Sequence, residues 1–218
     1  MRDHSMTECH HAALEACLGQ VVAPETVARL DRLSDIVTHW TRRINLIAPS
    51  SVGIIWARHI LDSAQLFNFL PPGTTRWADL GSGGGFPGLV IAIMAADLHP
   101  DLRVTLVESD ARKAAFLGTA ANSLGLDVTV HRARAENLAP LGADVVSARA
   151  VAPLPRLLDH VDRHMTDGGR AILPKGASHA SELAAAQKSW HFRCEAIASR
   201  TEPAAVILII EDLSRERD

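Results

Sequence analysis

Apolar side chains recur at helical spacing near the start of the chain. Pro24 and Glu25 suit a first helical turn, and the apolar positions that follow them are Val27, Leu30, Leu33, Val37, Trp40 and Ile44. This stripe predicts an amphipathic helix over residues 24–44 that packs against a core. A second helix is expected over residues 52–69, before the turn signal at residues 71–73.

From residue 76 the pattern changes to short apolar runs that alternate with longer helical segments. The runs predict strands at residues 76–80, 102–107, 128–130, 144–147, 170–173, 192–199 and 204–211. Helices are expected at residues 89–96, 112–124, 154–165 and 178–190. Gly125 is expected to cap the second of these helices.

Strands that alternate with helices form a parallel sheet covered on both faces. The last two runs are joined only by residues 200–203, so they are expected to form an antiparallel hairpin. The pattern predicts an α/β fold of the Rossmann-like, class I methyltransferase type. It has a mostly parallel seven-stranded sheet, an antiparallel C-terminal edge and additional N-terminal helices. We expect a helical extension over residues 1–72 and a cofactor-binding domain over residues 73–218.

Composition narrows the functional classes. The chain has 218 residues, of which 47% are hydrophobic, enough for one α/β domain with a small extension. Aromatic residues make up only 4%, which argues against a platform on which several bases stack. The net charge of −3 is unlike that of a generic nucleic-acid binder, although a local basic face remains open.

The cysteines and apolar runs indicate a cytoplasmic protein. Cys9, Cys17 and Cys194 are odd in number and form no short pairing motif, which favours a reducing compartment. We expect no metal site. The best candidate for a membrane segment, residues 204–210, is only as long as a strand, so no membrane partner is expected.

A glycine-rich loop lies between the first predicted strand and its helix, with the sequence DLGSGGGFPG at residues 79–88. Such a loop lets a ligand approach the backbone at the carboxyl edge of a sheet. Asp79, Gly81, Gly83 and Gly85 match an acidic-x-G-x-G-x-G phrase, which favours S-adenosylmethionine, with Asp79 facing the methionine part. A dinucleotide pattern also fits if counted from Gly83, but it places a proline inside the loop.

Glu108 ends the second predicted strand, 23 residues after Gly85. A carboxylate about 20 residues beyond the loop accepts hydrogen bonds from ribose hydroxyls. Glu108 therefore predicts a nucleoside cofactor without choosing between S-adenosylmethionine and NAD.

Several phrases together resemble one family, RsmG, also called glucose-inhibited division protein B. They are RHILDS at residues 58–63, the loop at residues 79–88, SARA at residues 147–150 and KG at residues 175–176, with WTRRINL at residues 40–46 in partial agreement. The resemblance covers about residues 30–210. It implies methyl transfer from S-adenosylmethionine to N7 of guanine 527 in bacterial 16S rRNA.

The resemblance also implies site residues. Cofactor contacts carry over to Gly81, Phe86, Ala135, Glu136 and Arg149. Candidates for RNA contact are Arg58, His59, Arg149 and Lys175. The implied partner is 16S rRNA or the small ribosomal subunit, and we expect a monomer.

No catalytic base is expected, because guanine N7 offers a lone pair without losing a proton. Three alternatives stay open at this stage. The chain could methylate another RNA or a small molecule, it could be an NAD-dependent oxidoreductase, or it could be a non-catalytic module that binds the ribosome.

Overall fold

A seven-stranded sheet organises the computed structural model, which describes residues 4–216. The strands lie in the order β3-β2-β1-β4-β5-β7-β6. Their bounds are β1 (Arg76–Leu80), β2 (Arg103–Glu108), β3 (Val128–Arg132), β4 (Ala143–Ala148), β5 (Met165–Lys175), β6 (Trp190–Ala198) and β7 (Val206–Arg215). The first five strands pair in parallel, and β7 runs antiparallel to both β5 and β6. The predicted sheet and its antiparallel edge are confirmed.

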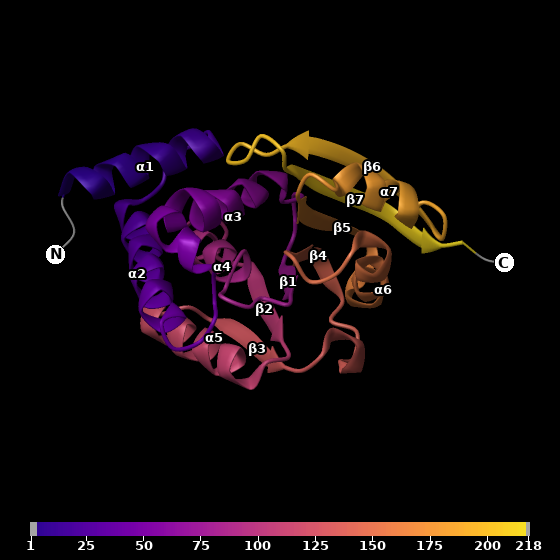
Figure 1. Ribbon diagram of the computed structural model, residues 1–218, viewed down its shortest axis with the longest axis horizontal. Coiled ribbons are helices and arrows are strands. Elements are labelled where there is room, and N and C mark those ends of the chain that lie inside the picture. Colours follow the sequence, from indigo (N-terminus) through magenta and orange to yellow (C-terminus); the bar gives the residue numbers. More distant parts are fainter. Residues whose placement is uncertain (1–3, 217–218) are drawn as a thin grey trace.

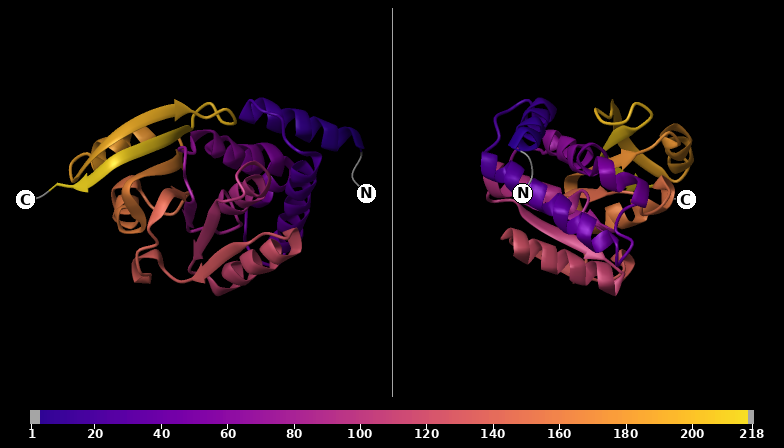
Figure 2. Two further views of the ribbon diagram at one scale, coloured as in Figure 1. Left: turned by 180° about the vertical axis from the view of Figure 1, so that it is seen from behind. Right: turned by 60° about the vertical axis from the view of Figure 1, so that its left-hand side comes forward.

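Helices cover both faces of the sheet (Figures 1 and 2). On one face, α4 (Gly88–Leu98) and α5 (Ala111–Leu124) contact the strands, α2 (Pro24–Thr41) packs on these two helices, and α1 (His4–Leu18) packs on α2. The other face carries α6 (Leu154–His164) and α7 (His179–Ala186). Successive residues of β1 belong to the two hydrophobic cores in turn. Trp77 belongs to the core that includes residues of α2, α4 and α5, and Ala78 belongs to the core that includes residues of α6. Burial on both faces explains why the strands read as nearly continuous apolar runs.

The helix expected over residues 52–69 is not regular. The chain there forms a 3-10 segment η1 (Pro49–Ile54), a π turn η2 (Trp56–Leu61), a short α3 (Asp62–Ala64) and a second 3-10 segment η3 (Gln65–Phe69). The Ser63 hydroxyl donates to the His59 carbonyl at 2.6 Å, which supports the widened turn. π turns recur at functional sites, and this one carries Arg58 and His59 to the carboxyl edge of the sheet.

Helix α1 lies within the helical extension expected over residues 1–72, although no apolar stripe there predicted its bounds. Its structure depends on tertiary contacts: the His10 ring stacks on Trp56 with centroids 3.9 Å apart, and both side chains bond to Asp31. Leu14 of α1 and Trp77 of β1 belong to one hydrophobic cluster. The division at residue 72 therefore stays a prediction about chain organisation. In the described part of the chain, no helix is both long enough and apolar enough to cross a membrane.

Candidate functional site

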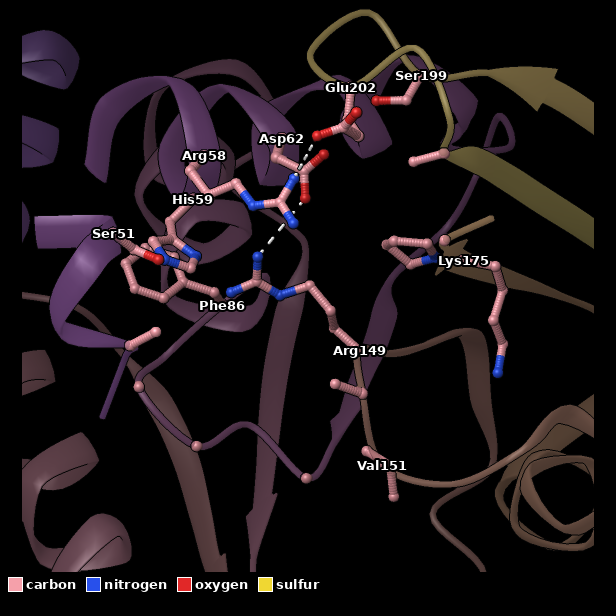
Figure 3. A pocket seen from close by; sticks show the side chains of 18 of the residues that line it. Ser51, Arg58, His59, Asp62, Phe86, Arg149, Val151, Lys175, Ser199 and Glu202 are labelled. Atoms are coloured by element: carbon pink, nitrogen blue, oxygen red, sulfur yellow. Dashed lines mark hydrogen bonds and ion pairs between the residues drawn. The ribbon is translucent and has the colours of Figure 1, made fainter. Parts of the chain in front are cut away.

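A cavity of about 1100 Å³ opens at the carboxyl ends of the central strands. Strands β1 and β4 are neighbours, and the chain moves outward from them in opposite directions, so this edge is a topological switch point. The walls come from the glycine loop, the π turn, the segments that follow β4 and β5, and the connection between β6 and β7 (Figure 3). Ligands of α/β sheets bind at this kind of edge.

Glycines give the loop its shape. Gly81 and Gly83 have φ values of +68° and +52°, in the left-handed region that other residues rarely adopt. The amides of Gly81 and Ser82 both donate to the Val107 carbonyl, at 2.8 and 3.0 Å, so the loop folds over the end of β2. A Cβ added at Gly83 would meet only the Gly81 carbonyl oxygen, at 3.7 Å. The backbone at Gly83 thus borders open space in the cavity.

Glu108 braces this loop from the end of β2. Its Oε2 accepts the Gly83 amide at 2.9 Å, and its Oε1 accepts the Asp110 amide at 2.7 Å. The side chain is 7% exposed and lines the cavity. A carboxylate oxygen can accept two hydrogen bonds, so each oxygen keeps one acceptor site for a ligand.

Asp79 has a different position from the one expected. Its carboxylate is fully buried and does not line the cavity. It accepts the Ser147 hydroxyl at 2.8 Å and the Gly88 amide at 3.1 Å, and Ser147 in turn accepts the Trp77 indole N–H at 2.8 Å. Burial raises the pKa of Asp79 to about 6, against the hydrogen bonds that favour its charged form. Asp79 therefore joins β1 and β4 to the start of α4, and its predicted contact with methionine is unsupported by this geometry.

Arg149 follows the end of β4 and reaches across the cavity. Its guanidinium lies 3.5 Å from a carboxylate oxygen of Asp62 and 5.4 Å from the centre of the Phe86 ring. Burial lowers the pKa of Arg149, and the carboxylates of Asp62 and Asp79 oppose this effect. Asp62 also accepts the Thr201 hydroxyl at 2.7 Å, so this pair links the start of α3, the end of β4 and the β6–β7 connection.

The other RNA-contact candidates have internal partners. Arg58 pairs with Glu202 at 3.0 Å, and half of the arginine side chain is exposed. Lys175 is 10% exposed and donates to Glu182 at 2.9 Å and to the Ala152 carbonyl at 3.2 Å. Lys175 thus holds the segment after β4, whereas Arg58 presents its charge toward solvent. His59 stacks on Phe86, with ring centroids 5.0 Å apart.

Ala135 and Glu136 lie in the short turn η4 (Ala135–Asn137) that follows β3. Neither residue lines the cavity. The Ala135 carbonyl is held by Nε2 of the fully buried His164 at 2.9 Å, and the exposed Glu136 lies 3.9 Å from Arg134. Gly85 also lies outside the cavity lining. The structure thus brings Gly81, Gly83, Phe86, Glu108 and the four RNA-contact candidates together in one cavity. Four predicted site residues lie outside the cavity lining: Asp79, Gly85, Ala135 and Glu136.

Four polar residues support the site but were given no role from the sequence: Asp62, Ser147, Glu182 and Glu202. Asp62 and Ser147 fall inside the phrases RHILDS and SARA, which was the available signal. Glu182 and Glu202 had no such signal, because their partners are distant in sequence or reached only after folding. Among residues 4–216, no group of His, Cys, Asp or Glu is arranged to hold a metal ion.

Comparison with known proteins gives one family. The family model described as rRNA small subunit methyltransferase G matches residues 26–203. Proteins named ribosomal RNA small subunit methyltransferase G are similar over most of their length. The one from Ruegeria sp. (strain TM1040) is 47% identical over 89% of this chain and 94% of its own. The one from Paramagnetospirillum magneticum is 46% identical over 90% of this chain and 93% of its own.

Solved structures share the fold at low sequence identity. A SAM-dependent methyltransferase from Aquifex aeolicus superposes with a TM-score of 0.56 at 13% identity, over 79% of this chain and 98% of its own. M. jannaschii TYW2, solved in complex with AdoMet, gives a TM-score of 0.54 at 14% identity, over 72% of this chain and 76% of its own. These similarities support the fold class predicted from the strand and helix pattern.

Proposed function

We propose that this chain, which belongs to the rRNA small subunit methyltransferase G family, transfers a methyl group from S-adenosylmethionine to N7 of a guanine in 16S rRNA. The observation that carries the proposal is the pairing of Gly83 with Glu108 on the wall of the cavity. Family membership supports an rRNA of the small subunit as the substrate. The proposed partner is 16S rRNA or the assembled subunit, and the proposed location is the cytoplasm, with the protein acting as a monomer.

The cavity residues fit a nucleoside cofactor. Gly83 leaves open the space that a side chain would fill, and Glu108 keeps an acceptor site on each oxygen for the two ribose hydroxyls. When bound, S-adenosylmethionine supplies an electrophilic methyl group on a sulfonium. The chain then has to hold the cofactor and align the target base. Ala135 and Glu136, at the end of β3 on the same sheet edge, stay candidates for contact with the adenosine part.

The reaction requires positioning more than acid–base chemistry. Guanine N7 is an unprotonated acceptor atom, so no side chain has to remove a proton before the methyl group moves. Phe86 offers a ring surface beside the glycine loop, and Arg149 is fixed over that ring by Asp62. These fixed groups define where the target guanine can enter the cavity. No side chain is assigned as a general base.

The proposal is tested by methyl transfer followed by mapping. The purified protein is incubated with labelled S-adenosylmethionine and with either bare 16S rRNA or small subunits that lack the modification. The product is then cleaved at N7-methylguanine and mapped by reverse transcription. We expect a single modified guanine. Labelling of a small molecule but not of rRNA would favour the alternative substrate class. Cofactor binding without transfer to any ribosomal substrate would favour a non-catalytic module.

A further inference from the structure

The imidazole of His59 is buried on the cavity wall without a hydrogen-bond partner. Its side chain is 9% exposed, and neither Nδ1 nor Nε2 bonds to any residue within the range 4–216. Nearly all buried polar atoms in folded proteins are paired with protein or ordered water. His59 lines the cavity, but both ring nitrogens have almost no solvent-accessible surface, so a ligand in the cavity supplies the missing partner only when the side chains that cover the ring move aside.

The ring is held in a defined orientation (Figure 3). It stacks on Phe86 with centroids 5.0 Å apart and planes inclined by 26°. Arg149 also lies over the Phe86 ring, at 5.4 Å from its centre. Phe86 directly follows Gly85 within the loop at residues 79–88, so the His59 ring lies one side chain away from the proposed cofactor site.

His59 is unsuited to act as a counter-ion for phosphate. Burial lowers its pKa to about 4, and the neighbouring Arg149 and Arg58 add to this effect. At neutral pH the ring is uncharged, with one N–H donor and one acceptor nitrogen. The RNA contact expected of His59 is therefore one that a neutral ring can make, and not an ion pair with a phosphate.

The surroundings favour a ligand edge made of acceptors. Arg149 and Arg58 carry only donors, and the carboxylates of Asp62 and Glu202 are already engaged by these two arginines. A ligand group with N–H donors at this corner would face two cations, whereas an acceptor edge would face donors. On its Hoogsteen edge, guanine presents N7 and O6, both acceptors, while adenine carries an amino donor in place of O6.

We propose that His59 donates a hydrogen bond to O6 of the target guanine and so selects guanine over adenine. This inference rests on the proposed function, because it assumes that N7 of a guanine is the methyl acceptor. A donor at O6 holds the base through the second acceptor of its Hoogsteen edge and leaves the N7 lone pair free. His59 is thus a specificity-determining residue that contacts the substrate.

The test combines variants of His59 with altered target bases. His59→Phe keeps a flat ring on Phe86 and removes both nitrogens, whereas His59→Gln retains a donor. The substrates are 16S rRNAs carrying guanine, 2-aminopurine or inosine at the target position. 2-Aminopurine lacks O6 but keeps N7, and inosine keeps both atoms. S-adenosylhomocysteine affinity and the melting temperature are measured for each protein.

For the wild type, we expect kcat/KM to fall roughly 10- to 100-fold when 2-aminopurine replaces guanine, the effect of losing one buried hydrogen bond. His59→Phe should lose about as much on guanine and nothing further on 2-aminopurine. Inosine should behave like guanine in both proteins. Cofactor affinity should not change, and His59→Gln should regain part of the transfer.

The inference alone is overturned if His59→Phe transfers methyl to guanine undiminished. It is also overturned if His59→Phe discriminates against 2-aminopurine as strongly as the wild type does. Parallel loss of cofactor affinity also overturns it, because His59 would then act through the glycine loop. If His59→Phe does not fold, His59→Gln carries the test, and its failure to exceed the transfer of a His59→Ala protein counts against the inference. Absence of transfer by the wild type to all three RNAs overturns the proposed function itself.

Discussion

The Gly83 amide and the Glu108 carboxylate are joined by a hydrogen bond of 2.9 Å. The second carboxylate oxygen accepts the Asp110 amide at 2.7 Å. One side chain therefore fixes the backbone at Gly83, after β1, and at Asp110, after β2, and it also faces the cavity. The shape of the glycine loop and the proposed hold on the ribose depend on the same residue.

Replacing Glu108 with Ala should weaken S-adenosylhomocysteine binding roughly 10- to 150-fold, since hydrogen bonds to a charged group contribute about 1.5–3 kcal/mol. The melting temperature should also fall, because the Gly83 and Asp110 amides lose their acceptor. Isothermal titration calorimetry and thermal melting measure the two effects. Glu195→Ala, at an exposed position on β6, is the control. Unaltered affinity would mean that Glu108 serves only the fold.

Gly83→Val should abolish cofactor binding while the protein still folds. A side chain at this position enters the cavity, and its φ of +52° strains a branched residue. Gly73→Val is a matched control, since Gly73 has a φ of +78°, open space around it and no place in the cavity lining. Both variants should lose on the order of 1–3 kcal/mol of stability, and only the first should lose cofactor affinity. Equal affinity in the two proteins would show that the loop is merely a turn.

S-adenosylmethionine and S-adenosylhomocysteine should stabilise the protein against heat, and NAD should not. A ligand at 100 times its dissociation constant adds about 2.7 kcal/mol to the free energy of unfolding. Differential scanning fluorimetry with each compound distinguishes the two cofactor readings that Glu108 leaves open. A rise in melting temperature with NAD and none with S-adenosylmethionine or S-adenosylhomocysteine would contradict the assignment of S-adenosylmethionine as the cofactor.

Asp79→Asn should change how stability depends on pH. Because burial raises the folded-state pKa of Asp79 to about 6, from an ordinary value of 3.8, the folded state binds its proton more tightly than the unfolded state. Its ionisation therefore costs nothing below about pH 4 and its full amount above about pH 6. The stability of Asp79→Asn relative to the wild type should rise over this window, by an amount on the order of 2–3 kcal/mol. Urea unfolding from pH 4 to pH 7.5 measures it.

Asp144→Asn is the control for that experiment. Burial acts to raise the pKa of Asp144, but hydrogen bonds from Thr75 and Arg76 outweigh it and lower the pKa below 3.8. The stability that Asp144 contributes is present above its unfolded pKa and is lost only in more acidic solution. The stability difference between Asp144→Asn and the wild type should therefore stay level between pH 4.5 and pH 7.5. A rise like that of Asp79→Asn would assign the effect to a general change in charge.

Variants of Arg58 and Lys175 should distinguish a residue that binds RNA phosphate from one that maintains the geometry of the site. Arg58→Ala removes a half-exposed charge and should reduce the slope of log affinity for rRNA against log salt by about 0.7–0.9. Lys175→Ala should lower methyl transfer without changing the slope, because this lysine is bound to Glu182 and Ala152. Arg215, which pairs with Asp159 away from the cavity, gives the control Arg215→Ala. A changed slope in Lys175→Ala would mean that its ammonium leaves Glu182 to contact phosphate.

The sequence by itself determined the number of strands, the mostly parallel sheet with its antiparallel edge, and the place of the ligand edge, whereas the order of the strands came from the structure. Apolar runs of strand length, the glycine loop between β1 and α4 and the cap at Gly125 are local signals, and Gly125 does adopt a left-handed conformation with φ of +66°. Such features depend on residues close together in the chain, because backbone conformation and side-chain alternation are set within a few residues.

Only the tertiary structure decided what the polar residues of the site do. Asp62 and Arg149 are 87 positions apart in the chain, and nothing in either segment specifies their pairing. The regular helix expected over residues 52–69 gave way to 3-10 and π turns, and α1 formed where no pattern was recognised. Asp79 is part of the acidic-x-G-x-G-x-G phrase, yet its carboxylate is fully buried beside Ser147. His59 was a candidate for RNA contact, yet its ring is neutral and has no hydrogen-bond partner among the described residues. Burial and partner choice belong to the packed molecule, because desolvation and hydrogen bonding depend on which distant segments surround a group.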